Sequence, residues 1–148
     1  MAIGPRRRAR IVALQALFEA DNSNHEPMKS LQRIIESQRT GKAPAAFAAE
    51  LVQAVIERRD EIDGRIAKVA PAWPVDQLSA VDRNILRLAI SEMLGDNGTP
   101  VRAAINEAVE LAKTFGSEKS SSFVNGVLGT IAKEIEQTST DQPTVKRG

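Results

Sequence analysis

The sequence predicts an all-α protein, and three features of the residue pattern support this fold class. Apolar residues recur at spacings of about three and four along nearly the whole chain, as they do on one face of a helix. No segment alternates between apolar and polar residues as a strand does. Proline, glycine and asparagine interrupt the apolar stripes and divide the 148 residues into six or seven helices. This length and a hydrophobic content of 42% fit a single compact domain.

The N-terminal half is predicted to form three or four helices. Pro5 suits a helix start, where its missing N–H is not needed, and the apolar face that follows includes Phe18 but not Arg10 or Gln15. A further apolar stripe follows the third helix and ends near residue 70, so this region is either one long helix or two. The predicted helices cover about 6–21, 27–38 and 44–58, with a stripe over 62–70.

A proline-rich break at 71–74 separates the two halves. We interpret Trp73 within it as a packing residue that fixes the connector. Ser79 followed by Asp82 is typical of a helix N-cap, and the helix behind it ends near residue 94. After a turn at 96–100, another helix ends at Gly116, and the last apolar stripe covers 124–135. The sequence thus predicts a helical domain over residues 1–137 and a disordered tail over 138–148.

The composition excludes several classes of function. Cysteine is absent, so thiol nucleophiles, iron–sulfur clusters and disulfides are excluded. His25 is the single histidine, lies in a polar connector, and is most simply a solvated loop residue. No phosphate-loop motif occurs, and the carboxylate pairs fall on charged helix faces, so we predict neither an enzyme nor a bound cofactor or metal. No apolar run is long enough to span a bilayer, and a cytoplasmic protein is expected.

The distribution of charge suggests a polyanionic partner. The net charge is +1, yet residues 1–10 hold four of the 20 basic side chains and no acidic one. The rest of the chain carries 16 basic against 19 acidic side chains. A solvated basic tail explains this pattern as readily as contact with nucleic acid does. Phe123, close to Lys119 at the start of the last helix, is either a core residue or a platform on which a base stacks.

Three blocks of sequence, in order, resemble the NusB family of bacterial transcription antitermination factors. The first block is RRRARIVALQALF over residues 6–18, and the second is LSAVDRNILRLAISEML over residues 78–94. The third is AINEAVELAKTFG over residues 104–116, continued by FVNGVL over residues 123–128. Many relatives have a lysine directly before the phenylalanine, where this chain has Ser122, and Lys119 lies about one helical turn earlier. The resemblance covers most of the chain.

This resemblance implies two packed three-helix groups and a binding function. Members of the family bind the boxA element of single-stranded RNA together with NusE, a small-subunit ribosomal protein, and modify RNA polymerase elongation to support ribosomal RNA transcription. Gln15 and Asn125 are able to read base edges, although ordinary helix roles explain both. The candidate RNA-binding residues are Arg6, Arg7, Arg8, Arg10, Gln15, Lys119, Phe123 and Asn125. The candidate NusE-binding residues are Asp82, Arg83, Arg87 and Glu92.

Two other functions remain open at this stage. The chain could serve as a NusB-like accessory domain of a ribosomal RNA methyltransferase, although it has no cysteine to act as the methylation nucleophile. Alternatively, it is a purely structural helical partner protein whose arginines act as a solubilising tail. The resemblance further implies an elongation complex of RNA polymerase with other Nus factors as a partner, and it leaves open a homodimer formed through the RNA-binding arm.

Overall fold

The computed structural model describes residues 3–95 and 97–141, and within them it contains helices and no strand. The helices are α1 (Pro5–Ser23), α2 (Pro27–Ser37), α3 (Lys42–Val69), α4 (Ala80–Leu94), α5 (Val101–Phe115) and α6 (Ser120–Asp141), with a 3₁₀ turn η1 (Val75–Gln77). The all-α prediction is confirmed. In α4, the Ser79 hydroxyl accepts a hydrogen bond from the Asp82 N–H at 3.1 Å, as the predicted N-cap requires.

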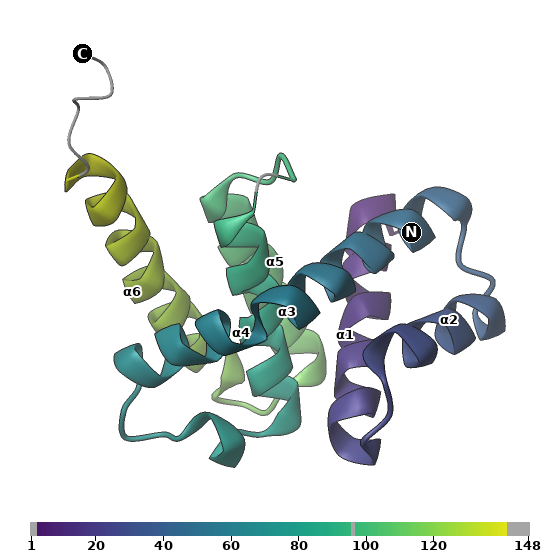
Figure 1. Cartoon of the computed structure of the whole chain (residues 1–148), viewed down its shortest axis with the longest axis horizontal. Coiled ribbons are helices and arrows are strands. Elements are labelled where there is room, and N and C mark those ends of the chain that lie inside the picture. The colour runs from purple at the N-terminus through teal and green to yellow at the C-terminus, as the bar shows by residue number, and fades with distance from the viewer. Residues whose placement is uncertain (1–2, 96, 142–148) are drawn as a thin grey trace.

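The six helices form two groups. Helices α1, α2 and α3 pack against one another, as do α4, α5 and α6, and contacts of α4 with α1 and α3 join the groups. Figure 1 shows α1 and α2 at one end of the molecule, α6 at the other, and α3 extending across both. One continuous core fills both groups, with Leu51 and Ile62 of α3 buried beside Leu88 of α4 and Leu128 of α6. The predicted arrangement of two packed three-helix groups is therefore confirmed.

The structure answers the open question about residues 44–70. The segment is a single helix, α3, interrupted at Arg58 by non-helical backbone angles of φ −111° and ψ 15°. The charged stretch from Glu57 to Glu61 is exposed around this kink, whereas Val55 and Ile62 on either side are buried. The kink thus lets one helix bury apolar residues in both groups.

Several details differ from the sequence-based expectations. Arg10 was placed off the apolar stripe of the first helix but is 5% exposed, whereas Phe18, placed on the stripe, is 37% exposed. Trp73 is 60% exposed, so its interpretation as a packing residue is wrong.

The last helix begins at Ser120 and extends to Asp141, beyond the start of the predicted tail. Residues 142–148 lie outside the described residues, and the disorder of the tail stays a prediction. No helix in the described ranges has the length and hydropathy of a membrane span.

Candidate nucleic-acid interface

The first turns of α1 present three exposed arginines. Pro5 occupies the first turn of the helix, so Arg6, Arg7 and Arg8 project from successive positions around its start. The Arg6 guanidinium carbon lies 4.3 Å from the centre of the Phe47 ring, and Nη1 lies 3.5 Å from Thr99 Oγ1. Arg8 has no side-chain hydrogen bond or ion pair among residues 3–95 and 97–141. Arg6 thus lies over α3 and the turn between α4 and α5. We call the exposed side chains of Arg6, Arg7 and Arg8 the arginine arm.

Arg7 makes a two-pronged ion pair with Glu107 in the middle of α5. Its Nε and Nη2 atoms donate to the two carboxylate oxygens at 3.1 and 3.0 Å. The hydrogen bond from Arg7 lowers the pKa of the Glu107 carboxyl below its ordinary value, against the opposing effect of partial burial. The Arg7 side chain is 51% exposed, so a phosphate from solution can compete with Glu107 for it. Sequence reasoning had assigned Glu107 to a charged helix face and missed this role.

Arg10 and Glu92 lie deeper and bind each other. Arg10 Nε and Nη2 donate to the two Glu92 oxygens at 2.8 Å each, and the two side chains are 6% and 2% exposed. Burial by itself lowers the pKa of the Arg10 guanidinium, but hydrogen bonding and the charge of Glu92 raise it above the ordinary value overall. In this conformation neither side chain is available for the RNA or NusE contact predicted for it. Their pairing instead joins α1 to α4.

The other predicted RNA contacts lie on α1 and at the start of α6. Gln15 is partly exposed, and its Oε1 accepts a hydrogen bond from Gln38 Nε2 at 3.0 Å. Lys119, directly before α6, is exposed, as is Asn125 within it. Phe123 is partly buried and packs against the core. Its partial burial is consistent both with a core residue and with a platform on which a base stacks.

The arginine arm and the start of α6 lie at different points along α5. Arg7 contacts α5 at Glu107, whereas Lys119 follows the end of this helix at Phe115. Eight residues separate Glu107 from Phe115, which corresponds to about 12 Å of helix rise. One ligand that touches both groups must therefore run along α5, and a flexible single strand has the reach to do so.

The predicted NusE-binding residues of α4 have unequal exposure. Asp82 is partly exposed at the start of the helix. Arg83 is 12% exposed, and its guanidinium binds Asp21 Oδ2 of α1 at 2.8 Å and the carbonyl oxygens of Val75 and Leu78. Arg87 is 5% exposed and donates to both oxygens of Asp63 at 2.8 and 2.9 Å. The two arginines hold helices together. Asp82 remains a candidate, although its Oδ1 is buried and has no hydrogen-bond partner among the described residues.

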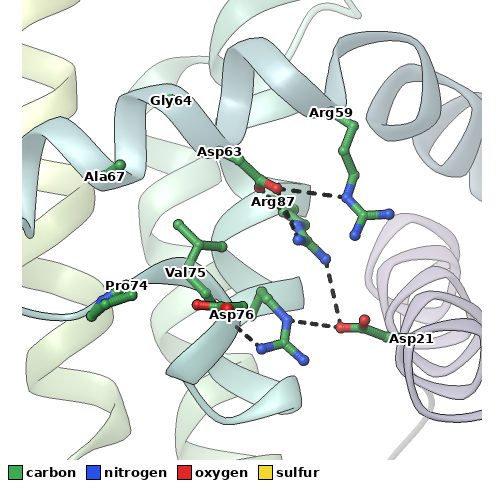
Figure 2. A pocket seen from close by; sticks show the side chains of 10 residues that line it. Asp21, Arg59, Asp63, Gly64, Ala67, Pro74, Val75, Asp76 and Arg87 are labelled. Atoms are coloured by element: carbon green, nitrogen blue, oxygen red, sulfur yellow. Dashed lines mark hydrogen bonds and ion pairs between the residues drawn. The ribbon is translucent and has the colours of Figure 1, made fainter.

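A hollow of about 770 Å³ lies beside these arginines, and Figure 2 shows the side chains around it. Arginine and aspartate side chains alternate across it, and Arg59 extends the ion-pair network at its rim. Partial burial raises the pKa of Asp21, but hydrogen bonds from Asn84 and Arg83 and the nearby positive charges lower it overall. The charges around the hollow compensate one another. Within the described residues, no group of three histidine or carboxylate side chains is arranged to hold a metal ion.

Phe18 is a further exposed residue that sequence reasoning did not select. It was placed on the apolar face of the first helix, yet it is 37% exposed and lies one turn before Asp21, the partner of Arg83. A single exposed apolar side chain is common on protein surfaces and does not by itself mark a binding site. The interest of Phe18 lies in its position one turn from Asp21, which binds Arg83 of α4. The sequence carried no signal for this exposure, because Leu17 and Phe18 are adjacent and only packing decides which one is buried.

Fold and surface together define a class of protein: a two-group helical protein with an exposed arginine arm and no recognisable catalytic constellation in the described residues. The model of the NusB family matches this chain over residues 7–133. The chain belongs to the NusB family. It is 44% identical, over 90% of its length and 93% of the relative's, to the transcription antitermination protein NusB of Dehalococcoides mccartyi.

Solved structures agree with this assignment. The chain matches T. maritima NusB with a TM-score of 0.83 and 36% identity, covering 90% of this chain and 94% of that one. It also matches a chain in a crystal structure of the antitermination factors NusB and NusE in complex with double-stranded RNA. That match has a TM-score of 0.81 and 30% identity, and covers 88% of this chain and 97% of the other.

Proposed function

We propose that this protein is an RNA-binding transcription antitermination factor that acts together with NusE, and that it is not an enzyme. The observation that carries the proposal is the exposed arginine arm of Arg6, Arg7 and Arg8 on a chain of the NusB family. The Dehalococcoides relative, matched over 93% of its length, is named for antitermination, which favours this function over a methyltransferase accessory domain. A purely structural protein with a solubilising tail would account for the exposed arginines but not for membership of the NusB family.

The RNA is the boxA element, held at two places. Arg6, Arg7 and Arg8 neutralise phosphates, and Lys119 with the partly exposed Phe123 supports a base further along α5. Arg7 exchanges its Glu107 carboxylate for a phosphate, which its exposure permits. Gln15 and Asn125 are the side chains with amide groups able to select bases. Arg10 takes no direct part, because Glu92 occupies its guanidinium.

NusE docks on the face formed by α1 and the start of α4. Asp82 supplies a partly exposed carboxylate whose buried Oδ1 has no partner in the described part of the chain, and Phe18 supplies an exposed apolar side chain on the neighbouring helix. Arg83 and Arg87 act as positioning residues, since they fix α4 against α1 and α3. The complex works in the cytoplasm, where it joins RNA polymerase and other Nus factors during ribosomal RNA transcription. A homodimer that covers the arm would compete with RNA.

Fluorescence anisotropy with labelled boxA RNA tests the proposal. We expect boxA to bind more tightly than a scrambled RNA, and NusE to strengthen binding to boxA. If three phosphates are contacted, the logarithm of the affinity falls against the logarithm of salt with a slope of about −2, from roughly −0.7 per phosphate. Alanine at Arg6, Arg7 and Arg8 should flatten this slope. The matched control places alanine at Arg65, Lys68 and Lys133.

Equal, weak binding of both RNAs that NusE does not improve would contradict the proposal. The same conclusion would follow if the arm variant and the control variant lost affinity equally, since the effect would then reflect net charge alone. Sedimentation with and without RNA addresses the homodimer, because a dimer that persists on bound RNA is incompatible with a covered arm.

A further inference from the structure

A second hollow, of about 300 Å³, lies between the start of α1 and the turn that joins α2 to α3. Arg8 and Arg39 both line it, and none of its lining residues is acidic. Arg39, like Arg8, has no side-chain hydrogen bond or ion pair to any residue the structure describes. The hollow therefore differs from the one around Arg83 and Arg87, in which every arginine meets a carboxylate.

The backbone at Arg39 favours glycine, not arginine. Its φ is +52°, in the left-handed region, and it directly follows Gln38 at the end of α2. The Arg39 N–H donates to Glu36 O and the Thr40 N–H donates to Ile35 O, the paired bonds of a Schellman motif. Glycine is the usual residue at this position because a side chain there is strained. The Arg39 backbone closes the end of α2, but its guanidinium makes no hydrogen bond or ion pair with the described residues and can bind a ligand.

The backbone around the hollow adds to the positive charge. Gly41, the N-cap of the 28-residue helix α3, lines the hollow and supplies no side-chain oxygen to the helix start. The N–H groups of Lys42 and Ala43 therefore keep their positive potential there, whereas Pro44, the third residue of the helix and also part of the lining, has no N–H. Thr40 also lines the hollow, and its hydroxyl, although buried, has no hydrogen-bond partner in the described part of the chain. Arginines, helix start and hydroxyl are together suited to an anionic oxygen ligand.

The hollow adjoins the candidate RNA surface. Arg8 belongs to the arginine arm, and Gln38 at the wall of the hollow donates to Gln15, one of the candidate base readers. A strand held by the arm therefore passes beside this hollow. We propose that the hollow formed by Arg8 and Arg39 binds one phosphodiester group of the RNA, beyond the part held by Arg6 and Arg7. This inference rests on the proposed RNA-binding function and assigns to it a site on the α2–α3 turn.

Replacing Arg39 with glycine is a sharp test, because it removes the guanidinium and relieves the backbone strain. A loss of RNA affinity cannot then come from unfolding, and we expect the melting temperature, followed by circular dichroism, to stay equal or rise. One phosphate contact changes the salt slope by roughly 0.7, which corresponds to about a fivefold loss of affinity at 0.1 M salt and little loss near 1 M. Arg39→Lys should recover part of this affinity. Lys133→Gln, at an exposed position of α6, is the matched control for the loss of one positive charge.

The outcomes separate this inference from the proposed function. If Arg39→Gly and Lys133→Gln change the affinity and the salt slope equally, the hollow does not bind a phosphate, while the comparison of boxA with scrambled RNA still tests RNA binding. An RNA trimmed to boxA and a longer RNA locate the bound phosphate. If the trimmed RNA binds the wild type and Arg39→Gly equally, but the longer RNA binds the wild type more tightly, the phosphate in the hollow lies outside boxA. If millimolar inorganic phosphate raises the melting temperature of the wild type but not of Arg39→Gly, while the two proteins bind RNA equally tightly, the hollow binds a free anion. This result would overturn the inference. If the wild type binds no RNA, the proposed function itself fails.

Discussion

Replacing Arg10 with methionine leaves the Glu92 carboxylate buried without its cation. Glu92 is 3% exposed, and its other side-chain hydrogen bond among residues 3–95 and 97–141 comes from the Asn97 amide at 3.5 Å. Removing one partner of a buried ion pair costs about 3–5 kcal/mol, because the other charge stays out of water without compensation. We therefore expect Arg10→Met to lower the free energy of unfolding by about that amount. This is a large fraction of the roughly 5–15 kcal/mol that stabilises a typical domain.

The double variant Arg10→Met/Glu92→Met gives the decisive comparison. It removes both charges from the same buried position, so it should be more stable than Arg10→Met alone by at least about 2 kcal/mol. Urea unfolding followed by circular dichroism at the helix band measures this difference. Trp73 fluorescence is a poor probe, since this side chain is 60% exposed in the folded protein.

Two results would refute the reasoning. If Arg10→Met costs less than about 1 kcal/mol, the pair is not buried and coupled as its geometry indicates. If the two single changes simply add in the double variant, there is no pairwise interaction. The double variant should also bind RNA within about twofold of the wild type, in contrast to variants of the arm. A loss of RNA affinity as large as that of the Arg6, Arg7 and Arg8 variant would show that Arg10 leaves Glu92 and contacts RNA.

Three further predictions follow from local geometry. Because the folded-state pKa of Asp21 lies below its ordinary value of 3.8, the free energy of unfolding should fall as pH drops below about 4, and Asp21→Asn should flatten this fall in urea titrations. Gly116→Ala should destabilise by about 1–3 kcal/mol, measured by thermal unfolding, because the new Cβ would lie 2.5 Å from the Ser120 side chain. Glu107→Gln should tighten RNA binding by about twofold to fivefold at low salt by releasing Arg7, and unchanged anisotropy curves would contradict this.

The positions of several helix ends could be predicted from the sequence because the residues that start or end a helix act locally. Pro5, the Ser79 cap and Gly116 lie at or beside helix ends where the pattern placed them, since each acts on its own turn of backbone. The kink at Arg58 was not predicted, because the charged residues around it carry no local helix-breaking signal, and α3 as a whole contacts both helical groups. Trp73 was misjudged for the related reason that an aromatic residue between prolines carries no local sign of exposure.

The sequence by itself determined the all-helical class, several helix ends and the presence of an arginine-rich start, because periodicity, capping and composition are properties of short segments. Tertiary structure alone decided what each arginine does. Arg7 and Arg10 are one turn apart, yet Arg7 meets Glu107 at the surface and Arg10 is buried against Glu92. Their partners lie 100 and 82 residues away, so burial and charge compensation were set by how the two helical groups pack.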